Sequence, residues 1–230
     1  MKELPDSKIY ELEMNYWPYK TSWRKVLELI VEKSPKNGAL LDVMCGPGYL
    51  LGQIAQKRKD LELSGQDFDK RYISYSKKTY PNIGFELGDI LTWKPKELSD
   101  VVTCTGSVHH MPYELQAKTV ERIAEMVKPG GFAIISDCFI DDYGDERERK
   151  LAAAKLGYEY LRETIENGAP NEAIVPALDI LWNDVMRDEF KTSMKKRLPV
   201  YEKSFKKVET IKTWPEFDSE YGDYISICWK

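Results

Sequence analysis

The sequence predicts an α/β domain with a mostly parallel seven-stranded sheet, a closing antiparallel strand and a helical insertion before the last strand pair. Three observations lead to this prediction. Short apolar runs alternate with helical patterns up to about residue 140, a glycine-rich turn follows the first run, and a long helical stretch then precedes two final strands. Such alternation is typical of a parallel sheet that is covered by helices on both faces.

The elements follow from apolar periodicity and from Gly and Pro at their ends. A first helix, capped by Thr21 or Ser22, ends at 35–38, and further helices are expected at 49–57, 71–78 and 115–127, the last ended by 129–131. The helical stretch spans 145–198 with a break at 167–170. Strands are predicted at 39–44, 61–65, 83–86, 100–105, 132–136, 208–213 and 224–229.

The composition indicates a soluble globular protein with 42% hydrophobic and 31% charged residues. Its net charge of −4 does not suit phosphate backbones, so we expect no nucleic-acid partner. Residues 1–6 contain no apolar signal segment, and no run approaches the ~20 apolar residues of a membrane span. We therefore expect a cytoplasmic protein that binds no membrane.

The four cysteines give no metal or redox signature. Cys45, Cys104, Cys138 and Cys228 form no CxxC pair, which argues against a zinc ribbon or a thioredoxin-like site. Three of them lie in apolar runs that resemble central strands, as is typical of buried reduced thiols. No metal site is predicted.

A glycine-rich loop, Asp-Val-Met-Cys-Gly-Pro-Gly-Tyr at 42–49, follows the first strand and opens a helix. Glycine lets the backbone approach a ligand closely because it has no Cβ. Asp67 ends the next strand, about 20 residues further on, where a carboxylate can accept hydrogen bonds from ribose hydroxyls. Up to this point a nicotinamide-dependent dehydrogenase fits equally well.

Two further acids favour a cationic ligand over an anionic one. Asp42 lies in the first strand, near the mouth of the predicted cleft, where it would repel a pyrophosphate and suit an ammonium or sulfonium group. Asp89 follows the third strand and can accept a hydrogen bond from an adenine amino group. Three acids at three strand ends therefore indicate a cationic ligand that contains adenosine.

These residues carry a family resemblance. The segments 42–48, 66–68, 88–90, 100–110 and 127–131 resemble, in order and spacing, the motifs of the class I S-adenosylmethionine-dependent methyltransferases. The resemblance covers about 40–137 and the closing strands. It implies a Rossmann-like methyltransferase fold, S-adenosylmethionine as cofactor with S-adenosylhomocysteine as product, and methyl transfer to an N, O or C nucleophile of a small molecule.

The resemblance also implies roles for single residues. The methionine moiety would lie near Asp42, Gly46 and Thr105, and Gly48 would let the backbone pass the adenosyl group. Ribose would be held by Asp67, followed by Phe68, and adenine by Asp89 and Ile90. One position departs from the family: Met44 stands where glycine is usual, so its side chain must point away from the cofactor or narrow the pocket.

The methyl acceptor should meet residues beyond the fourth and fifth strands. His109 and His110 are the only histidines of the chain. A histidine has a pKa near neutrality, so either one is a candidate general base, although orienting the substrate is the alternative. Asp137 ends the fifth strand and could bind or deprotonate an amine or hydroxyl; the alternative is a solvated strand end.

The helical insertion should shape the acceptor pocket. An apolar stripe with a four-residue spacing is typical of core or interface, which makes a homodimer an option, and a lid over the substrate is the alternative. For Tyr16 and Trp17 the alternatives are the same: core or interface packing, or a lid over the substrate. Together with Trp182 they are candidate substrate-binding residues. Lys191, Lys195, Lys196 and Arg197 are most simply a solvated face. The stripe consists of Leu178, Trp182, Met186, Phe190, Met194 and Leu198.

A weaker resemblance concerns 183–198, which is similar to the insertion of carboxy-S-adenosylmethionine synthase. It implies that Arg197 would bind an extra carboxylate on the cofactor. An enzyme that modifies the cofactor therefore stays open, as do a non-catalytic cofactor-binding protein and a dehydrogenase. We expect one domain, with a cap at 1–34, a cofactor-binding core at 35–140, an insertion or lid at 141–200 and a strand pair at 201–230.

Overall fold

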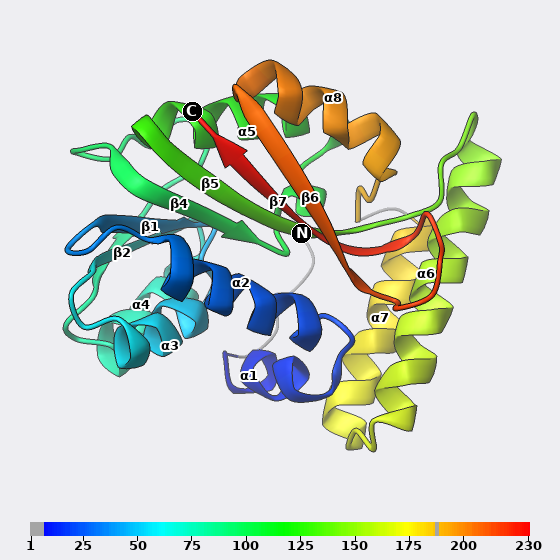
Figure 1. Cartoon of the computed structure of the whole chain (residues 1–230). Coiled ribbons are helices and arrows are strands. Elements are labelled where there is room, and N and C mark those ends of the chain that lie inside the picture. The colour runs from blue at the N-terminus through cyan, green and yellow to red at the C-terminus, as the bar shows by residue number, and fades with distance from the viewer. Residues whose placement is uncertain (1–6, 187–188) are drawn as a thin grey trace.

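All seven strands join one sheet in the computed structural model, which describes residues 7–186 and 189–230 (Figure 1). The strand order is β3-β2-β1-β4-β5-β7-β6, and β7 runs antiparallel to both of its neighbours. The predicted mostly parallel sheet is confirmed. The strands are β1 (Ala39–Val43), β2 (Glu62–Asp67), β3 (Gly84–Leu87), β4 (Ser99–Thr105), β5 (Val127–Phe139), β6 (Lys207–Trp214) and β7 (Gly222–Trp229).

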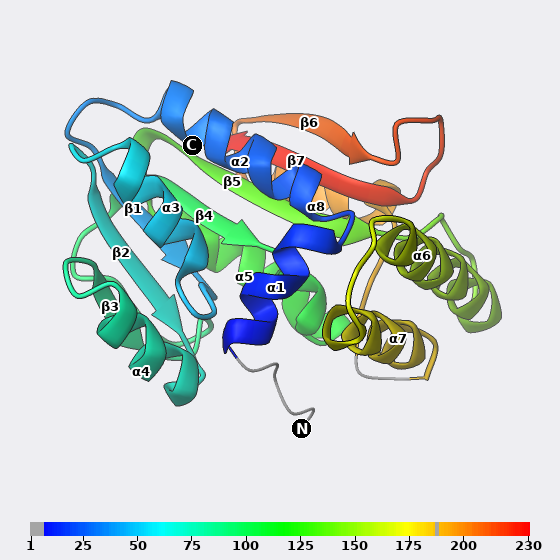
Figure 2. The ribbon, with the colours of Figure 1, turned by 90° about the horizontal axis from the view of Figure 1, so that it is seen from below.

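Helices cover both faces of this sheet (Figures 1 and 2). Successive side chains of a strand point to opposite faces. Leu40 and Ile134 thus join the apolar cluster under α2 and α3, whereas Leu41 and Ile135 join the cluster under α5 and α8. The helices before the insertion are α1 (Ser7–Tyr16), α2 (Lys20–Lys33), α3 (Tyr49–Lys57), α4 (Lys70–Thr79), the single 3₁₀ turn η1 (Val108–His110) and α5 (Tyr113–Met126).

Two predicted boundaries are wrong. Neither Thr21 nor Ser22 caps α2, which already begins at Lys20; Ser22 is buried and its hydroxyl bonds to that of Thr213 in β6. Residues 129–131 do not end a helix either. The structure places them inside β5, which begins directly after α5 and pairs with β4 from its first residue.

The insertion consists of α6 (Glu146–Glu166), α7 (Asn171–Met186) and α8 (Met194–Ser204). Asp145 and Ser193 cap α6 and α8, each accepting a hydrogen bond from a backbone N–H of the first turn. α6 and α7 pack side by side as a hairpin at one end of the sheet, and α8 packs on α5 (Figures 1 and 2).

The apolar stripe of the insertion is divided between α7, a connecting segment and α8, so it is not one helical face. Trp182 is 63% exposed, and Leu178 and Met186 are also exposed. The expectation of a core stripe is therefore wrong, while the interface and lid alternatives stay predictions. Arg187 and Asp188 in this segment, like residues 1–6, lie outside the described residues.

Candidate cofactor and acceptor site

The loop after β1 adopts the left-handed backbone conformation at three positions: Met44 (φ +54°), Gly46 (φ +53°) and Gly48 (φ +77°). At Gly48 a Cβ would lie 2.8 Å from the Phe85 ring, so conformation and space both require glycine. At Gly46 a Cβ would meet no atom within 4 Å. The loop therefore has an open side at Gly46, where a ligand can approach the backbone.

Met44 holds a conformation that costs a side-chain-bearing residue roughly 1–2 kcal/mol. Its half-buried side chain packs against the apolar cluster that includes Val43 and Ile90. This packing supplies stabilisation that can offset the strained backbone. The nonstandard residue is thus accommodated by the core on the α5 side of the sheet.

Asp42 is buried between its neighbours in β2 and β4, where it pairs in register with Gly65 and Thr103. The Thr103 hydroxyl donates a hydrogen bond of 2.6 Å to its Oδ1. Burial raises the pKa of Asp42 to about 7, although the Thr103 hydrogen bond opposes the shift. A cation bound beside it would favour the ionised carboxylate.

Asp67 ties the ends of β1 and β2 together. Its Oδ2 accepts a hydrogen bond of 2.9 Å from the Gly46 N–H, and its Oδ1 accepts one of 2.8 Å from the Asp69 N–H. Burial raises the pKa of Asp67. Its neighbour Phe68 is 56% exposed, so an aromatic face stands in solvent beside the predicted ribose site.

The predicted adenine residues differ in exposure. Asp89 is exposed and accepts a hydrogen bond of 2.8 Å from the Leu91 N–H, whereas Ile90 is buried in the cluster under α5. Asp89 can still offer a carboxylate oxygen to a ligand. Ile90 packs in the core next to this turn.

α1 lies across the carboxyl end of the sheet (Figure 2). Its Tyr10 packs against the apolar core, and burial followed by the charges of Tyr72, Asp42 and Glu13 raises the pKa of the Tyr10 hydroxyl. Glu13 is itself buried. The sequence predicted only an aromatic-rich segment here, and no pattern indicated that Tyr10 lies near Asp42 or that Glu13 is buried.

The ends of β4 and β5 bring both predicted catalytic elements together. Thr105 is half-buried and pairs with Ser136, and η1 then places His109 over Asp137. His109 Nδ1 contacts Asp137 Oδ1, and the His109 N–H donates a hydrogen bond of 3.1 Å to Asp137 Oδ2. Asp137 is buried, so the alternative of a solvated strand end is wrong.

A carboxylate that the sequence reasoning missed faces both histidines. Glu189 is buried, and its Oε2 lies 3.1 Å from His109 Nε2 and 3.0 Å from His110 Nδ1. Burial lowers the pKa of His109, but the Asp137 carboxylate outweighs burial and leaves that pKa well above its usual value. Each ring nitrogen of His109 thus faces a carboxylate, while the His110 side chain is 48% exposed.

A buried cation completes this ionic cluster. Lys191 Nζ lies 2.5 Å from Asp184 Oδ1 and 3.7 Å from Glu189 Oε2. Lys191 and Arg197 are 3% and 2% exposed, so placing them on a solvated face is wrong; Lys195 and Lys196 are exposed as expected. The partners of Lys191, Asp184 and Glu189, are near in sequence, but α7 ends at Met186, so helical periodicity does not relate the lysine to them.

The predicted substrate-binding residues occupy different places. Trp17 Nε1 donates a hydrogen bond of 3.1 Å to the Ala173 carbonyl of α7, and the Tyr16 carbonyl accepts one of 2.7 Å from Asn167. These two residues therefore join the amino-terminal segment to the insertion. Trp182 is exposed, and Arg197 is buried with Nη2 donating to Gln116 Oε1.

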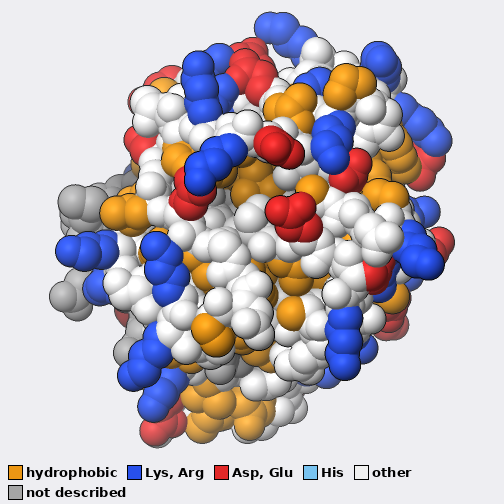
Figure 3. All heavy atoms as spheres, turned by 90° about the vertical axis from the view of Figure 1, so that its left-hand side faces the viewer, with side chains coloured by type: hydrophobic (Ala, Val, Ile, Leu, Met, Phe, Trp, Pro, Cys, Tyr) orange, Lys and Arg blue, Asp and Glu red, His pale blue; other side chains and the backbone are white. Residues whose placement is uncertain are grey.

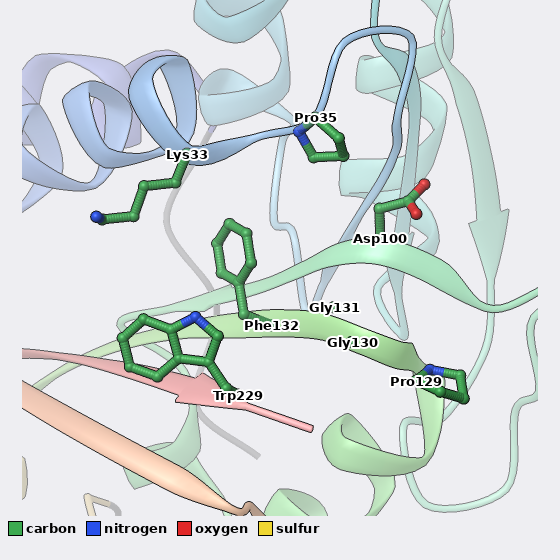
Figure 4. A pocket seen from close by; sticks show the side chains of 8 residues that line it. All are labelled: Lys33, Pro35, Asp100, Pro129, Gly130, Gly131, Phe132 and Trp229. Atoms are coloured by element: carbon green, nitrogen blue, oxygen red, sulfur yellow. The ribbon is translucent and has the colours of Figure 1, made fainter.

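A hollow of about 510 Å³ lies at the opposite end of the sheet, near Asp100, Gly131 and Trp229 (Figure 4). It lies far along the strands from the acids and histidines described above, and we assign it no part in the site. On this side of the molecule, Lys and Arg side chains are interspersed with Asp and Glu (Figure 3).

Three thiols are buried as predicted, and Cys45 is half-buried. Burial raises the pKa of Cys104 well above its usual value, as expected of an unreactive thiol. Within the described part of the chain, no helix has the length and apolar character that crossing a membrane requires.

Comparison with known proteins agrees with this geometry. The family model of the methyltransferase domain matches residues 40–131. Trans-aconitate 2-methyltransferase of Methylobacterium radiotolerans is 28% identical over 91 residues, or 40% of this chain and 34% of that protein. Carboxy-S-adenosyl-L-methionine synthase of Campylobacter lari is 25% identical over 123 residues, or 52% of each chain. The match thus spans about a third to a half of these relatives.

The fold has solved counterparts. The N-methyltransferase NodS of Bradyrhizobium japonicum WM9 aligns over 98% of both chains with a TM-score of 0.58 and 14% sequence identity. Residues 40–131, with the motif residues at the strand ends, are thus similar to the class I S-adenosylmethionine-dependent methyltransferases, and the likeness to NodS shows the fold. S-adenosylmethionine is the cofactor on which that family depends.

Proposed function

We propose that the protein transfers a methyl group from S-adenosylmethionine to an N, O or C nucleophile of a small molecule. One observation carries the proposal: Asp42 in β1 and Asp67 in β2 lie near the carboxyl ends of adjacent parallel strands, Asp89 follows the neighbouring β3, and the loop after β1 has an open side at Gly46. Ligands of such sheets bind at the carboxyl ends of the strands. Three carboxylates there fit a ligand that carries an ammonium, a sulfonium and an adenosine.

The cofactor would supply a methyl group on a positively charged sulfur, which leaves as the thioether when the acceptor attacks the methyl carbon. Asp42 would balance the positive charge, and Asp67 would exchange part of its bonding to the loop for ribose hydroxyls. The fold mainly provides positioning and exclusion of water. α1 would contribute through Tyr10, which packs against the core where the charge of Asp42 reaches its hydroxyl.

On the acceptor side we propose different roles for the two histidines. His109 and Asp137 hold each other in place, since both ring nitrogens of His109 face carboxylates. His110 is half-exposed and is the candidate to meet the acceptor or to take its proton. A cytoplasmic location, the acceptor contacts of Tyr16, Trp17 and Trp182, and a homodimer through the exposed side of α7 stay predictions.

Calorimetric titration tests cofactor binding. We expect saturable binding of S-adenosylmethionine and S-adenosylhomocysteine, reduced by about tenfold or more in Asp67→Asn because a hydrogen bond to a charged group is lost. Asp179→Asn, at an exposed position of α7, is the matched control and should bind like the wild type. Binding of NAD without binding of S-adenosylmethionine would overturn the proposal.

A second candidate is an enzyme that modifies the cofactor itself, as a carboxy-S-adenosylmethionine synthase does. The observation in its favour is Arg197: among the described residues its buried Nη1 has no hydrogen-bond partner, so it could bind an anion. Mass spectrometry of the ligand that co-purifies with the protein separates the two. A carboxylated cofactor supports this candidate, and unmodified S-adenosylmethionine or S-adenosylhomocysteine supports methyl transfer.

A further inference from the structure

Beyond the cofactor loop, the cluster at the ends of β4 and β5 has the composition of a metal site. His109, His110 and Glu189 offer two imidazole nitrogens and one carboxylate oxygen within 4.8 Å of one another. Two histidines and one carboxylate are a common ligand set for divalent transition metals, which bind imidazole well and keep open positions for water or substrate. The sequence predicted no metal site because its cysteines form no CxxC pair, and nothing in the sequence pattern connects Glu189 with the two histidines.

The distances within the cluster match one metal ion. Glu189 Oε2 is 3.1 Å from His109 Nε2 and 3.0 Å from His110 Nδ1. Ligand atoms about 2.0–2.2 Å from a common ion in tetrahedral or octahedral geometry lie roughly 3 Å apart along an edge of the coordination polyhedron. The two distances from Glu189 thus have the spacing of neighbouring ligands, and all three donor atoms lie within 4.8 Å of one another.

The surroundings of His109 fit a metal ligand as well. Its other nitrogen, Nδ1, contacts the buried carboxylate of Asp137. A metal-bound histidine usually donates its second N–H to a carboxylate, which fixes the ring and its tautomer. The exposed fraction of His110, 48%, leaves one side of the cluster accessible from solvent.

The charges near the cluster allow a bound cation. Asp137, Asp184 and Glu189 are buried carboxylates, and Lys191 lies 2.5 Å from Asp184 but 3.7 Å from Glu189. Lys191 lies closer to Asp184 than to Glu189, and the three buried carboxylates outnumber this lysine, so the charge of the cluster is compatible with a bound cation. We propose that His109, His110 and Glu189 bind one divalent transition-metal ion, with Asp137 as the positioning residue of His109.

Metal titration of the tag-free, chelator-treated protein tests the site independently of methyl transfer. The probes are Zn²⁺ by calorimetry and Co²⁺ by visible absorption, both without cofactor. We expect one ion per chain, with affinity lowered by at least about tenfold in His110→Gln and in Glu189→Gln, and by about tenfold in Asp137→Asn. The exposed Glu114→Gln is the control and should bind like the wild type.

A second group of possible ligands shares His109 and supplies an internal comparison. Cys138 Sγ lies 3.9 Å from His109 Nδ1, next to Asp137. Cys138→Ser should leave binding unchanged, and bound Co²⁺ should show no thiolate charge-transfer band. Thermal melting of each variant identifies unfolded protein; His110→Gln alters a half-exposed side chain and keeps the test valid if Glu189→Gln does not fold.

Three results would overturn the proposal: no saturable binding of either ion by the wild type, binding unchanged in the folded His110→Gln variant, or loss of binding in Cys138→Ser. The first result would show that the contacts of His109 and His110 with Glu189 are hydrogen bonds and ion pairs without a metal ion. Failure of the metal titration would leave cofactor titration unaffected, so the two proposals fail separately.

Discussion

At the carboxyl edge of the sheet, the cofactor end (the loops after β1, β2 and β3) and the acceptor end (the cluster at the ends of β4 and β5) hold Asp67 and Glu189 in different ways. At the cofactor end, Asp67 accepts hydrogen bonds from backbone N–H groups of nearby loops, at Gly46 and Asp69. At the acceptor end, Glu189 meets His109 and His110 from a distant part of the chain. Backbone-held acids follow from local turns, whereas side-chain-held acids depend on how the insertion packs.

The largest test of this difference is Lys191→Met. It removes the cation from buried Asp184 and Glu189 while keeping most of the apolar volume, and breaking a buried ion pair typically costs about 3–5 kcal/mol. We expect a loss of that order in the free energy of unfolding, measured by urea denaturation. The control is Lys195→Met, whose side chain is 79% exposed and pairs with Asp142.

Lys195→Met should change stability by about 1 kcal/mol or less, because exposed pairs contribute little. Equal losses in the two variants would contradict the idea that the acceptor end depends on buried charge pairs.

The difference between local turns and packing of distant segments also explains which features the sequence predicted and which it did not. The interval 49–57 is also the observed range of α3, and the loop acids lie where their motifs placed them, because a strand, a turn and a helix start are local features. Lys191 and Arg197 were misplaced because their burial depends on Asp184, Gln116 and Asp137, which no periodicity links to them. The prediction of a core stripe was wrong because a four-residue spacing defines one face only within a single helix, and these residues are divided between α7, a connecting segment and α8.

Asp42 provides the next test, at the cofactor end. Burial raises its pKa from 3.8 to about 7, so between these pH values the native state binds a proton that the unfolded chain has lost. The free energy of unfolding should therefore fall as pH rises from about 4 to 7, with a contribution on the order of 3 kcal/mol from this group. Asp223, whose pKa burial raises to about 8, adds a slope of the same sign.

Asp42→Asn should flatten the pH profile of stability while keeping an acceptor for the Thr103 hydroxyl. In the wild type, affinity for S-adenosylmethionine should rise between pH 5 and 7, because a bound cation favours the carboxylate. In the variant this rise should disappear. Urea denaturation and calorimetry across that range measure both effects, with Asp179→Asn as control. An unchanged stability slope in Asp42→Asn would assign the dependence to another group.

The smallest expected effect concerns the contact between the amino-terminal segment and the insertion. Trp17 joins the amino-terminal segment to α7 through one hydrogen bond to the Ala173 carbonyl. Trp17→Phe should lower the free energy of unfolding by about 1 kcal/mol, the usual contribution of such a bond. Trp182→Ala, at a 63% exposed position of the same helix, should change it by about 0.5 kcal/mol or less. A larger effect at Trp182 than at Trp17 would mean that the exposed side of α7 is covered in solution, and concentration-dependent melting would then identify a second copy of the chain as the cover.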